Sequence, residues 1–195
     1  MTDETDNLEG QFLIAMPSMG DPRFERTVIY LCAHSRDGAM GFVINQVMER
    51  PSLPDFMRQL SIIGEDEEDR MPDELRRAPL HTGGPVEPGR GFVLHSPEFH
   101  LETTVRIDDE VSLTATLEIL RAIATGRGPE RVMLALGYSG WASGQLEEEI
   151  AANGWLTSPA DAALVFDGAN ETKYERALRK LGIDPSLLSG EAGHA

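Results

Sequence analysis

The sequence has 195 residues, of which 41% are hydrophobic and 26% charged, as is typical of one soluble globular domain. Its 33 acidic and 17 basic residues give a formal net charge of -16, which disfavours direct nucleic-acid binding. Cys32 is the only cysteine, so an intrachain disulfide and a disulfide-stabilised secreted scaffold are excluded.

The N-terminus is acidic and polar, and no apolar run approaches the length of a membrane span. We therefore expect a cytoplasmic protein that does not bind membranes. One small basic cluster, formed by Arg176, Arg179 and Lys180, is surrounded by acidic residues. We expect it to be a solvent-exposed helix face.

The first part of the chain predicts strands. Apolar, β-branched runs cover residues 12–16, 27–33 and 40–44, and the turn residues 36–38 make the last two a hairpin. Because both arms of this hairpin are nearly continuous apolar runs rather than alternating ones, we expect both of their faces to be covered.

The middle part predicts a short helix around residues 56–63 and then a charged loop over 64–78. Strands are expected at 80–82 and 91–95, on either side of the turn-forming sequence GGPVEPGRG. Alternating polarity over 101–107 predicts a further strand with one face in water.

In the C-terminal half we expect a helix from Ser112, as its N-cap, to residue 124, and then a buried strand over 132–136. A turn over 137–141 leads to a helix over 143–153, and a strand follows at 163–166. Thr172 and Glu175 form a capping-box pattern for a last helix. With no linker or repeat, the sequence predicts a single domain over 1–195, with flexible tails at 1–9 and 189–195.

Four sequence blocks carry a family resemblance: LIAMPSMGDPRFERTVIYLCAHSRDGAMGFVIN, HTGGPVEPGRGFVLHS, LALGYSGWASGQLEEEI with NGWL, and KYERALRKLGID. In this order and over nearly the whole chain, they resemble the bacterial YqgE/AlgH family. The resemblance implies an α+β fold, in which a mixed, strongly bent sheet closes partly into a barrel and is flanked by helices. It implies no settled activity, and the AlgH label comes from a proposed regulatory role in exopolysaccharide production.

A transcriptional regulator that binds DNA directly needs a recognition helix and cations that contact phosphate. None of the predicted helices combines a basic surface with a helix-turn-helix partner. We therefore expect a non-enzymatic regulatory or binding protein that acts through a protein partner or a small ligand. Its oligomeric state stays open.

The alternative is an enzyme, because Gly137, Tyr138 and Ser139 match the first three positions of the G-x-S-x-G nucleophile elbow. Trp141 stands where the second glycine belongs, and the only histidine downstream of Ser139 is in the C-terminal tail. A hydrolase or transferase using Ser139 with His81 or His95, both upstream, stays open, but a structural Ser139 is favoured.

The sequence matches no known metal-binding or cofactor-binding motif. Cys32 and His34 are two residues apart, a spacing that matches no metal-binding motif, and the spacing of His95 and His100 fits no zinc motif either. No phosphate-binding loop is present. We expect neither a metal nor a cofactor.

The remaining candidate is a ligand site in which two glycine-rich segments expose backbone N–H groups beside aromatic walls. Its residues are Gly83, Gly84, Gly137, Tyr138, Ser139, Gly140 and Trp141. The alternative, which we favour, is that the glycines allow tight backbone packing and Trp141 fills the core.

Overall fold

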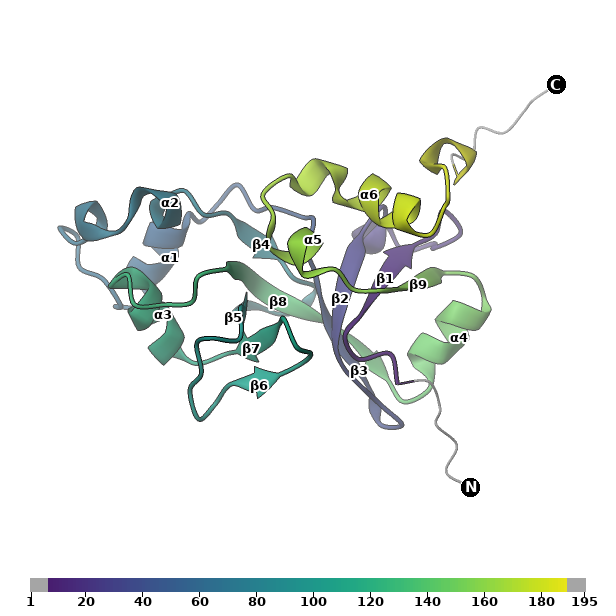
Figure 1. Cartoon of the computed structure of the whole chain (residues 1–195), viewed down its shortest axis with the longest axis horizontal. Coiled ribbons are helices and arrows are strands. Elements are labelled where there is room, and N and C mark those ends of the chain that lie inside the picture. Colours follow the sequence, from purple (N-terminus) through teal and green to yellow (C-terminus); the bar gives the residue numbers. More distant parts are fainter. Residues whose placement is uncertain (1–6, 189–195) are drawn as a thin grey trace.

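The computed structural model describes residues 7–188, and the nine strands of that range form one curled sheet (Figure 1). The strands are β1 (Gln11–Ala15), β2 (Val28–Ser35), β3 (Gly38–Val43), β4 (Leu80–Thr82), β5 (Val86–His95), β6 (Val105–Arg106), β7 (Ser112–Thr114), β8 (Val132–Ala142) and β9 (Trp155–Pro159). Their order is β6-β7-β5-β8-β3-β2-β1-β9, and β4 pairs with β8. All pairs are antiparallel except β4 with β8, so the expected mixed, bent sheet of an α+β domain is confirmed.

Six α-helices of the described range cover this sheet. They are α1 (Leu53–Gln59), α2 (Asp73–Arg76), α3 (Leu117–Ala124), α4 (Gln145–Ala151), α5 (Ala162–Phe166) and α6 (Lys173–Lys180). Figure 1 shows α1, α2 and α3 gathered at one end of the long axis, and α4 with β1 and β9 at the other. Over the described part of the chain, no helix is long and apolar enough to cross a membrane.

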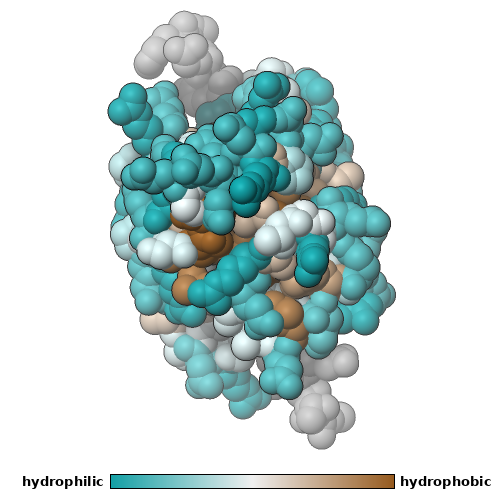
Figure 2. All heavy atoms as spheres, turned by 90° about the vertical axis from the view of Figure 1, so that its left-hand side faces the viewer, coloured by the Kyte–Doolittle hydropathy of each residue, from teal (hydrophilic) through white to brown (hydrophobic). Residues whose placement is uncertain are grey.

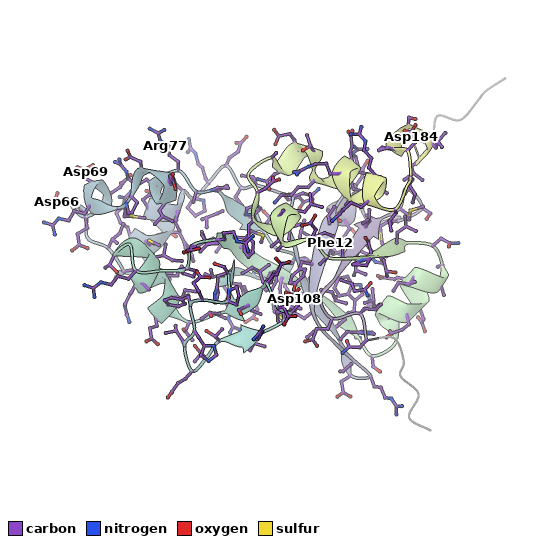
Figure 3. All side chains as sticks on the ribbon, viewed as in Figure 1. Phe12, Asp66, Asp69, Arg77, Asp108 and Asp184 are labelled. Carbon is purple, nitrogen blue, oxygen red and sulfur yellow. The ribbon has the colours of Figure 1, made fainter. Side chains whose placement is uncertain are left out.

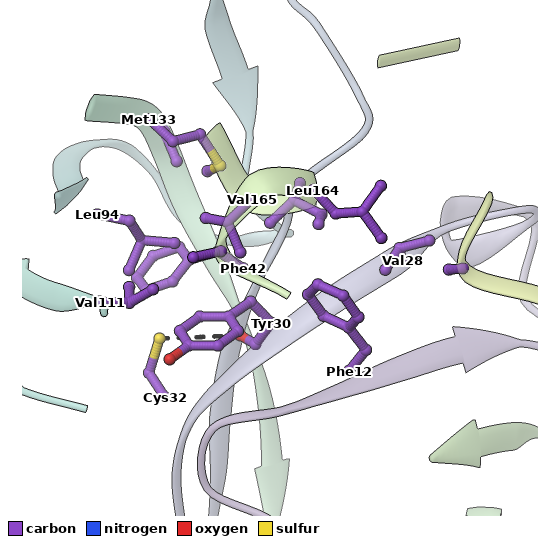
Figure 4. Packing of buried hydrophobic residues seen from close by; sticks show 14 of the residues in the cluster. Phe12, Val28, Tyr30, Cys32, Phe42, Leu94, Val111, Met133, Leu164 and Val165 are labelled. Carbon is purple, nitrogen blue, oxygen red and sulfur yellow. Dashed lines mark hydrogen bonds between the residues drawn. The ribbon is translucent and has the colours of Figure 1, made fainter. Parts of the chain in front are cut away.

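The central core lies between one face of the sheet and α5 and α6. Phe12 and Tyr30 meet edge to face there, with ring centroids 6.3 Å apart, and Val165 of α5 packs on the same cluster (Figure 4). Figure 3 shows Phe12 in the interior, whereas Asp66 lies at the periphery. Full burial of one such apolar side chain stabilises the fold by about 1.5–3 kcal/mol.

Two further apolar clusters cover the rest of the sheet. Leu13 and Ile29 point to the opposite face from Phe12 and pack with Leu146 of α4. The hairpin strands β2 and β3 place Tyr30 and Phe42 in the central core and Ile29 and Val43 in this second cluster, so the predicted covering of both faces of the hairpin is confirmed. The third cluster packs α1 and α3 on β4, β5 and β8. It comes close to the surface between α1 and α3, where Figure 2 shows apolar side chains in a hollow among polar ones.

Several predicted elements differ from the observed ones in the middle of the chain. Only Val105 and Arg106 of the stretch 101–107 form a strand, because Thr104 turns back and its backbone N–H donates to the Leu101 carbonyl oxygen at 3.0 Å. Ser112 begins β7 and does not cap a helix; α3 starts at Leu117. The charged segment 64–78 is not purely a loop, since it contains a 3-10 helix (Glu68–Arg70) and α2.

The C-terminal part also differs. The run expected as a strand at 163–166 is α5, whose first turn is capped by the Asp161 side chain accepting from Ala163 N at 2.9 Å. Strand β9 was not predicted at all. The Thr172 hydroxyl donates to the Ala169 carbonyl oxygen at 3.0 Å and makes no capping bond to α6, so the capping box was wrong.

The tails expected at 1–9 and 189–195 lie outside the described residues, apart from residues 7–9. Of these three, Leu8 is fixed, because its backbone N–H donates to Nδ1 of His34 at 3.1 Å. Leu8, which the sequence assigned to a flexible tail, is therefore attached to β2 through His34.

Candidate functional site

Residues 137–141 lie within the long central strand β8 and not in a turn. Gly137 adopts the left-handed φ of 72°, which favours glycine, and there the strand changes neighbours. Leu134–Leu136 pair in parallel with β4, whereas residues 139–142 pair antiparallel with β3. Strand β8 ends at Ala142, and Gly144 is the residue before α4. The predicted strand-turn-helix with its turn at 137–141 was therefore wrong. The bend at Gly137 instead joins the two halves of the sheet.

The structure brings Gly83 and Gly84 against β8, backbone to backbone. Gly83 N donates to the Leu136 carbonyl oxygen at 2.9 Å, and Val43 N donates to the Gly83 carbonyl oxygen at 2.9 Å. A Cβ on Gly83 would lie 2.3 Å from the Gly137 carbonyl oxygen, and one on Gly84 would lie 2.2 Å from the Tyr138 carbonyl carbon. The glycines therefore allow two backbones to cross at a distance that no side chain permits.

Ser139 is completely buried beneath this crossing. Its hydroxyl donates to the Gly83 carbonyl oxygen at 3.1 Å. The hydrogen bond links β8 to the segment after β4, which is a structural role.

The two candidate bases have other partners. His81 contacts the Leu134 carbonyl oxygen through Nδ1 and Oδ1 of Asn170 through Nε2, both at 3.1 Å. His95 contacts the Ser96 carbonyl oxygen at 2.9 Å and the Thr114 hydroxyl at 2.8 Å. Burial lowers the pKa of both imidazoles, which favours their neutral forms. All four ring nitrogens are thus engaged by groups other than Ser139.

Trp141 is buried and takes part in a hydrogen-bonded cluster on the α4 side of the sheet. Its Nε1 donates to Oε2 of Glu149 at 2.7 Å, and Nε1 of Trp155 donates to the same oxygen at 2.8 Å. Gln145 Nε2 donates to the other Glu149 oxygen at 3.3 Å. The indole of Trp141 therefore belongs to the core on the α4 side of the sheet, and the residue also borders a surface depression.

Three of the predicted site residues, Tyr138, Gly140 and Trp141, line an open surface depression of about 640 Å³. The other side chains that give it its chemistry are Met40, Val86, Glu9 and Asp37. We call it the Tyr138 depression. Tyr138 is half-buried and rests edge to face on Phe92, with centroids 5.7 Å apart, which fixes the ring at its floor.

His34 closes one side of the Tyr138 depression. Because its Nδ1 accepts the Leu8 N–H, the neutral ring carries its proton on Nε2, which lies 2.6 Å from Oε1 of Glu147. The backbone N–H of Glu147 and the His34 side chain hold the pKa of this carboxyl below its usual value. The described lining contains acids and no lysine or arginine, so the depression is electronegative.

Across residues 7–188, no group of three or more histidine, cysteine, aspartate or glutamate side chains is arranged to hold a metal ion.

Comparison with known proteins places the chain in a family. The family model described as AlgH-like (DUF179) matches residues 12–186. A UPF0301 protein of Beijerinckia indica is 59% identical, over 96% of this chain and 92% of the relative. A UPF0301 protein of Brucella melitensis is 53% identical, over 96% of this chain and 94% of the relative. The chain belongs to the AlgH-like UPF0301 family.

Solved structures agree with the fold of this family. The solution structure of the AlgH protein from Pseudomonas aeruginosa is similar with a TM-score of 0.80 and 40% identity, over 100% of both chains. A crystal structure of a Corynebacterium diphtheriae protein has a TM-score of 0.68 and 20% identity, over 89% of this chain and 86% of that one, which shows the fold alone.

Sequence reasoning missed several residues that line the depression in this AlgH-like chain. Met40 and Asp37 come from the β2–β3 hairpin, which pairs with β8 so that Met40 lies opposite Gly140. The hairpin itself was predicted, but its pairing with a strand 100 residues later leaves no local signal. Val86 lies in the GGPV segment that was singled out for its glycines.

Proposed function

We propose that this chain is a non-enzymatic cytoplasmic binding protein with a regulatory role, which recognises a protein partner through the Tyr138 depression. The shape of the depression supports a protein partner. It is broad and open, so it can accept side chains that protrude from another surface, whereas small-molecule sites usually enclose most of their ligand.

The chemistry of the depression favours a partner segment that carries basic residues beside apolar ones. Met40, Val86 and Tyr138 offer an apolar floor, and the exposed carboxylates of Glu9 and Asp37 lie in the same lining. A net charge of -16 also steers cationic partners toward the protein. A basic side chain of the partner can pair with these carboxylates while an apolar side chain next to it packs on the floor of the depression.

The AlgH resemblance is compatible with this mode of action. A regulatory role exerted through a protein partner requires no basic face, and the acidic composition disfavours operator DNA. A hydrolase or transferase, by contrast, would need Ser139 beside a base, and the hydrogen bonds of Ser139, His81 and His95 go to other groups.

The test is a titration of ¹⁵N-labelled protein with two short peptides of matched apolar content, one flanked by lysines and the other by glutamates. We expect the lysine peptide to shift backbone signals of residues 33–40 and 138–141, with an affinity that falls as salt rises. Replacing Glu9→Gln and Asp37→Asn together should weaken this binding.

The matched control replaces Glu65→Gln and Asp66→Asn, which removes the same charge from exposed acids at the α1–α3 end (Figure 3). Equal loss in both double variants would show that net charge alone attracts the peptide, and equal binding of the two peptides would show that charge plays no part in recognition. Either result would refute the depression as the proposed site.

A further inference from the structure

A second hollow lies at the opposite end of β1 and β2 from the Tyr138 depression. It has a volume of about 350 Å³ and lies between the loop that follows β1, the helix α6 and a 3-10 helix (Pro185–Leu188). Its chemistry comes from Met16, Met19, Pro22, Arg26, Tyr174 and Leu188. This volume falls in the range of pockets that enclose small molecules. We call it the Arg26 pocket.

The wall of the Arg26 pocket combines polar and apolar surface, and its apolar side chains include Met16, Met19 and Leu188. Met16 and Met19 supply flexible, polarisable side chains, which adapt to ligands of different shape. Tyr174 is buried, and its hydroxyl donates to the Ala15 carbonyl oxygen at 2.6 Å, so the ring is fixed and its polar group is already satisfied. Together, the two methionines and the Tyr174 ring can contact the apolar part of a ligand.

Arg26 is the only lysine or arginine in the described lining of the pocket. Its backbone holds the left-handed φ of 53°, which non-glycine residues rarely adopt. The side chain of Asn45 maintains this conformation, because its Nδ2 donates to the Arg26 carbonyl oxygen at 2.9 Å and its Oδ1 accepts from Val28 N at 3.0 Å. A strained residue held in this way fixes where its side chain leaves the loop.

The guanidinium of Arg26 is positioned and still has free donors. It lies over the Tyr174 ring, 4.7 Å from the centroid, and its Nη2 lies 3.8 Å from Oε1 of Glu175. Within residues 7–188 it donates no hydrogen bond. A guanidinium stacked on a ring keeps its N–H edge available for a planar anion such as a carboxylate.

From these observations we propose that the Arg26 pocket binds a small monocarboxylic acid with an aliphatic or aromatic body. One guanidinium matches one negative charge, and Glu25 in the lining with Glu175 nearby disfavours a dianion. A neutral or cationic ligand of the same shape leaves the guanidinium without an acceptor. This site is separate from the proposed partner surface, because the eight residues of β2 hold the two about 25 Å apart.

The test uses protein labelled with ¹³C at the methionine methyl groups and titrated with octanoate, octanol and octylammonium. Octanoate should shift the Met16 and Met19 signals saturably, at concentrations about ten-fold below any effect of the other two compounds. Shifts centred on other methionines, or equal binding of octylammonium, would overturn the proposal.

Variants of Arg26 test whether its guanidinium binds the carboxylate of the ligand. Arg26→Gln should weaken octanoate binding about ten-fold, whereas Arg26→Lys should retain part of it. The control is Arg23→Gln, an exposed cation of the same loop that pairs with Asp21 outside the pocket. The signals of the remaining methionines report whether each variant is folded. Folded Arg26→Gln that binds octanoate as the wild type does would also overturn the proposal.

The two proposals can fail independently. The double variant Glu9→Gln, Asp37→Asn should leave octanoate binding unchanged, and Arg26→Gln should leave binding of the lysine peptide unchanged. A change in octanoate binding caused by the double variant would contradict the separation of the two sites.

Discussion

Trp141 and Trp155 meet edge to face with centroids 6.0 Å apart, and both indole nitrogens donate to Oε2 of Glu149, at 2.7 and 2.8 Å. One carboxylate oxygen therefore joins strands β8 and β9 to the helix α4. Because indole N–H groups are donors only, each must find an acceptor when it is buried. Trp141 of this cluster also lines the Tyr138 depression.

Removing this acceptor should destabilise the domain. Glu149→Ala leaves two indole donors unsatisfied, so we expect a loss of about 2–4 kcal/mol in the free energy of unfolding. Glu148→Ala, an exposed neighbour on α4, should stay within about 0.5 kcal/mol. Urea unfolding measures both. Since the chain has only 2 tryptophans, their emission reports on the cluster directly, and an unshifted spectrum in Glu149→Ala would count against it.

The backbone of Gly83 and Gly84 crosses that of β8 so closely that we expect neither glycine to tolerate a side chain. A Cβ on Gly84 would meet three backbone atoms of Tyr138 and Ser139 at 2.2–2.3 Å, none of which can move independently. We expect Gly84→Ala to cost about 3 kcal/mol or more. Gly168→Ala is the control, because a Cβ there meets nothing within 4 Å. Equal melting temperatures of the two variants would show that the crossing is looser than described.

Because Lys173 is buried, we expect the free energy of unfolding to depend on pH. It is completely buried, its Nζ donates to the carbonyl oxygens of Ile44 and Val165 at 3.0 and 3.3 Å, and burial lowers its pKa from 10.5 to about 8. Between these two pKa values the unfolded chain binds the proton that the folded chain has lost. Stability from this group therefore rises with pH across that window, by at most about 1.4 kcal/mol per pH unit.

The measurement compares urea unfolding of wild type and Lys173→Met at neutral pH and at pH values inside that window. The difference in the free energy of unfolding should move in favour of the wild type as the pH rises. Lys180→Met controls for the removal of an exposed lysine from the same helix. A wild-type advantage that is constant over the window would contradict the lowered pKa of Lys173.

The sequence predicted those elements whose signal is local. The β2–β3 hairpin is readable because two apolar runs flank turn residues, and β4 was placed at its observed bounds. The AALVF run of α5 was misread because five apolar residues fit a strand and a buried helix equally well, and only the Asp161 cap distinguishes them. For β9 the strand character depends on its pairing with β1.

The candidate site was predictable in part for the same reason. The hypothesis of a ligand site included Tyr138, Gly140 and Trp141, which lie together along the Tyr138 depression, and the favoured alternative placed the glycines at close backbone contacts and Trp141 in the core. The sequence could not show that residues 137–141 continue a strand. Strand β8 pairs with β4 before Gly137 and with β3 after it, and only these long-range pairings explain why the strand bends at Gly137 and does not end there. Glu9 and Asp37 are far from this strand in the sequence and join its residues only in the folded lining of the depression.

The burial of Ser139 predicts that it is chemically inert. A nucleophilic serine must be reachable and must pass its proton to a base, whereas the Ser139 hydroxyl is inaccessible and donates to the Gly83 carbonyl oxygen. Incubation with a fluorophosphonate followed by intact-mass spectrometry should therefore show no adduct on the folded protein. Ser139→Ala should cost about 1 kcal/mol in the free energy of unfolding through the lost hydrogen bond, and should leave binding of the lysine peptide unchanged. A stoichiometric adduct that disappears in Ser139→Ala would instead establish a serine nucleophile and reverse the non-enzymatic proposal.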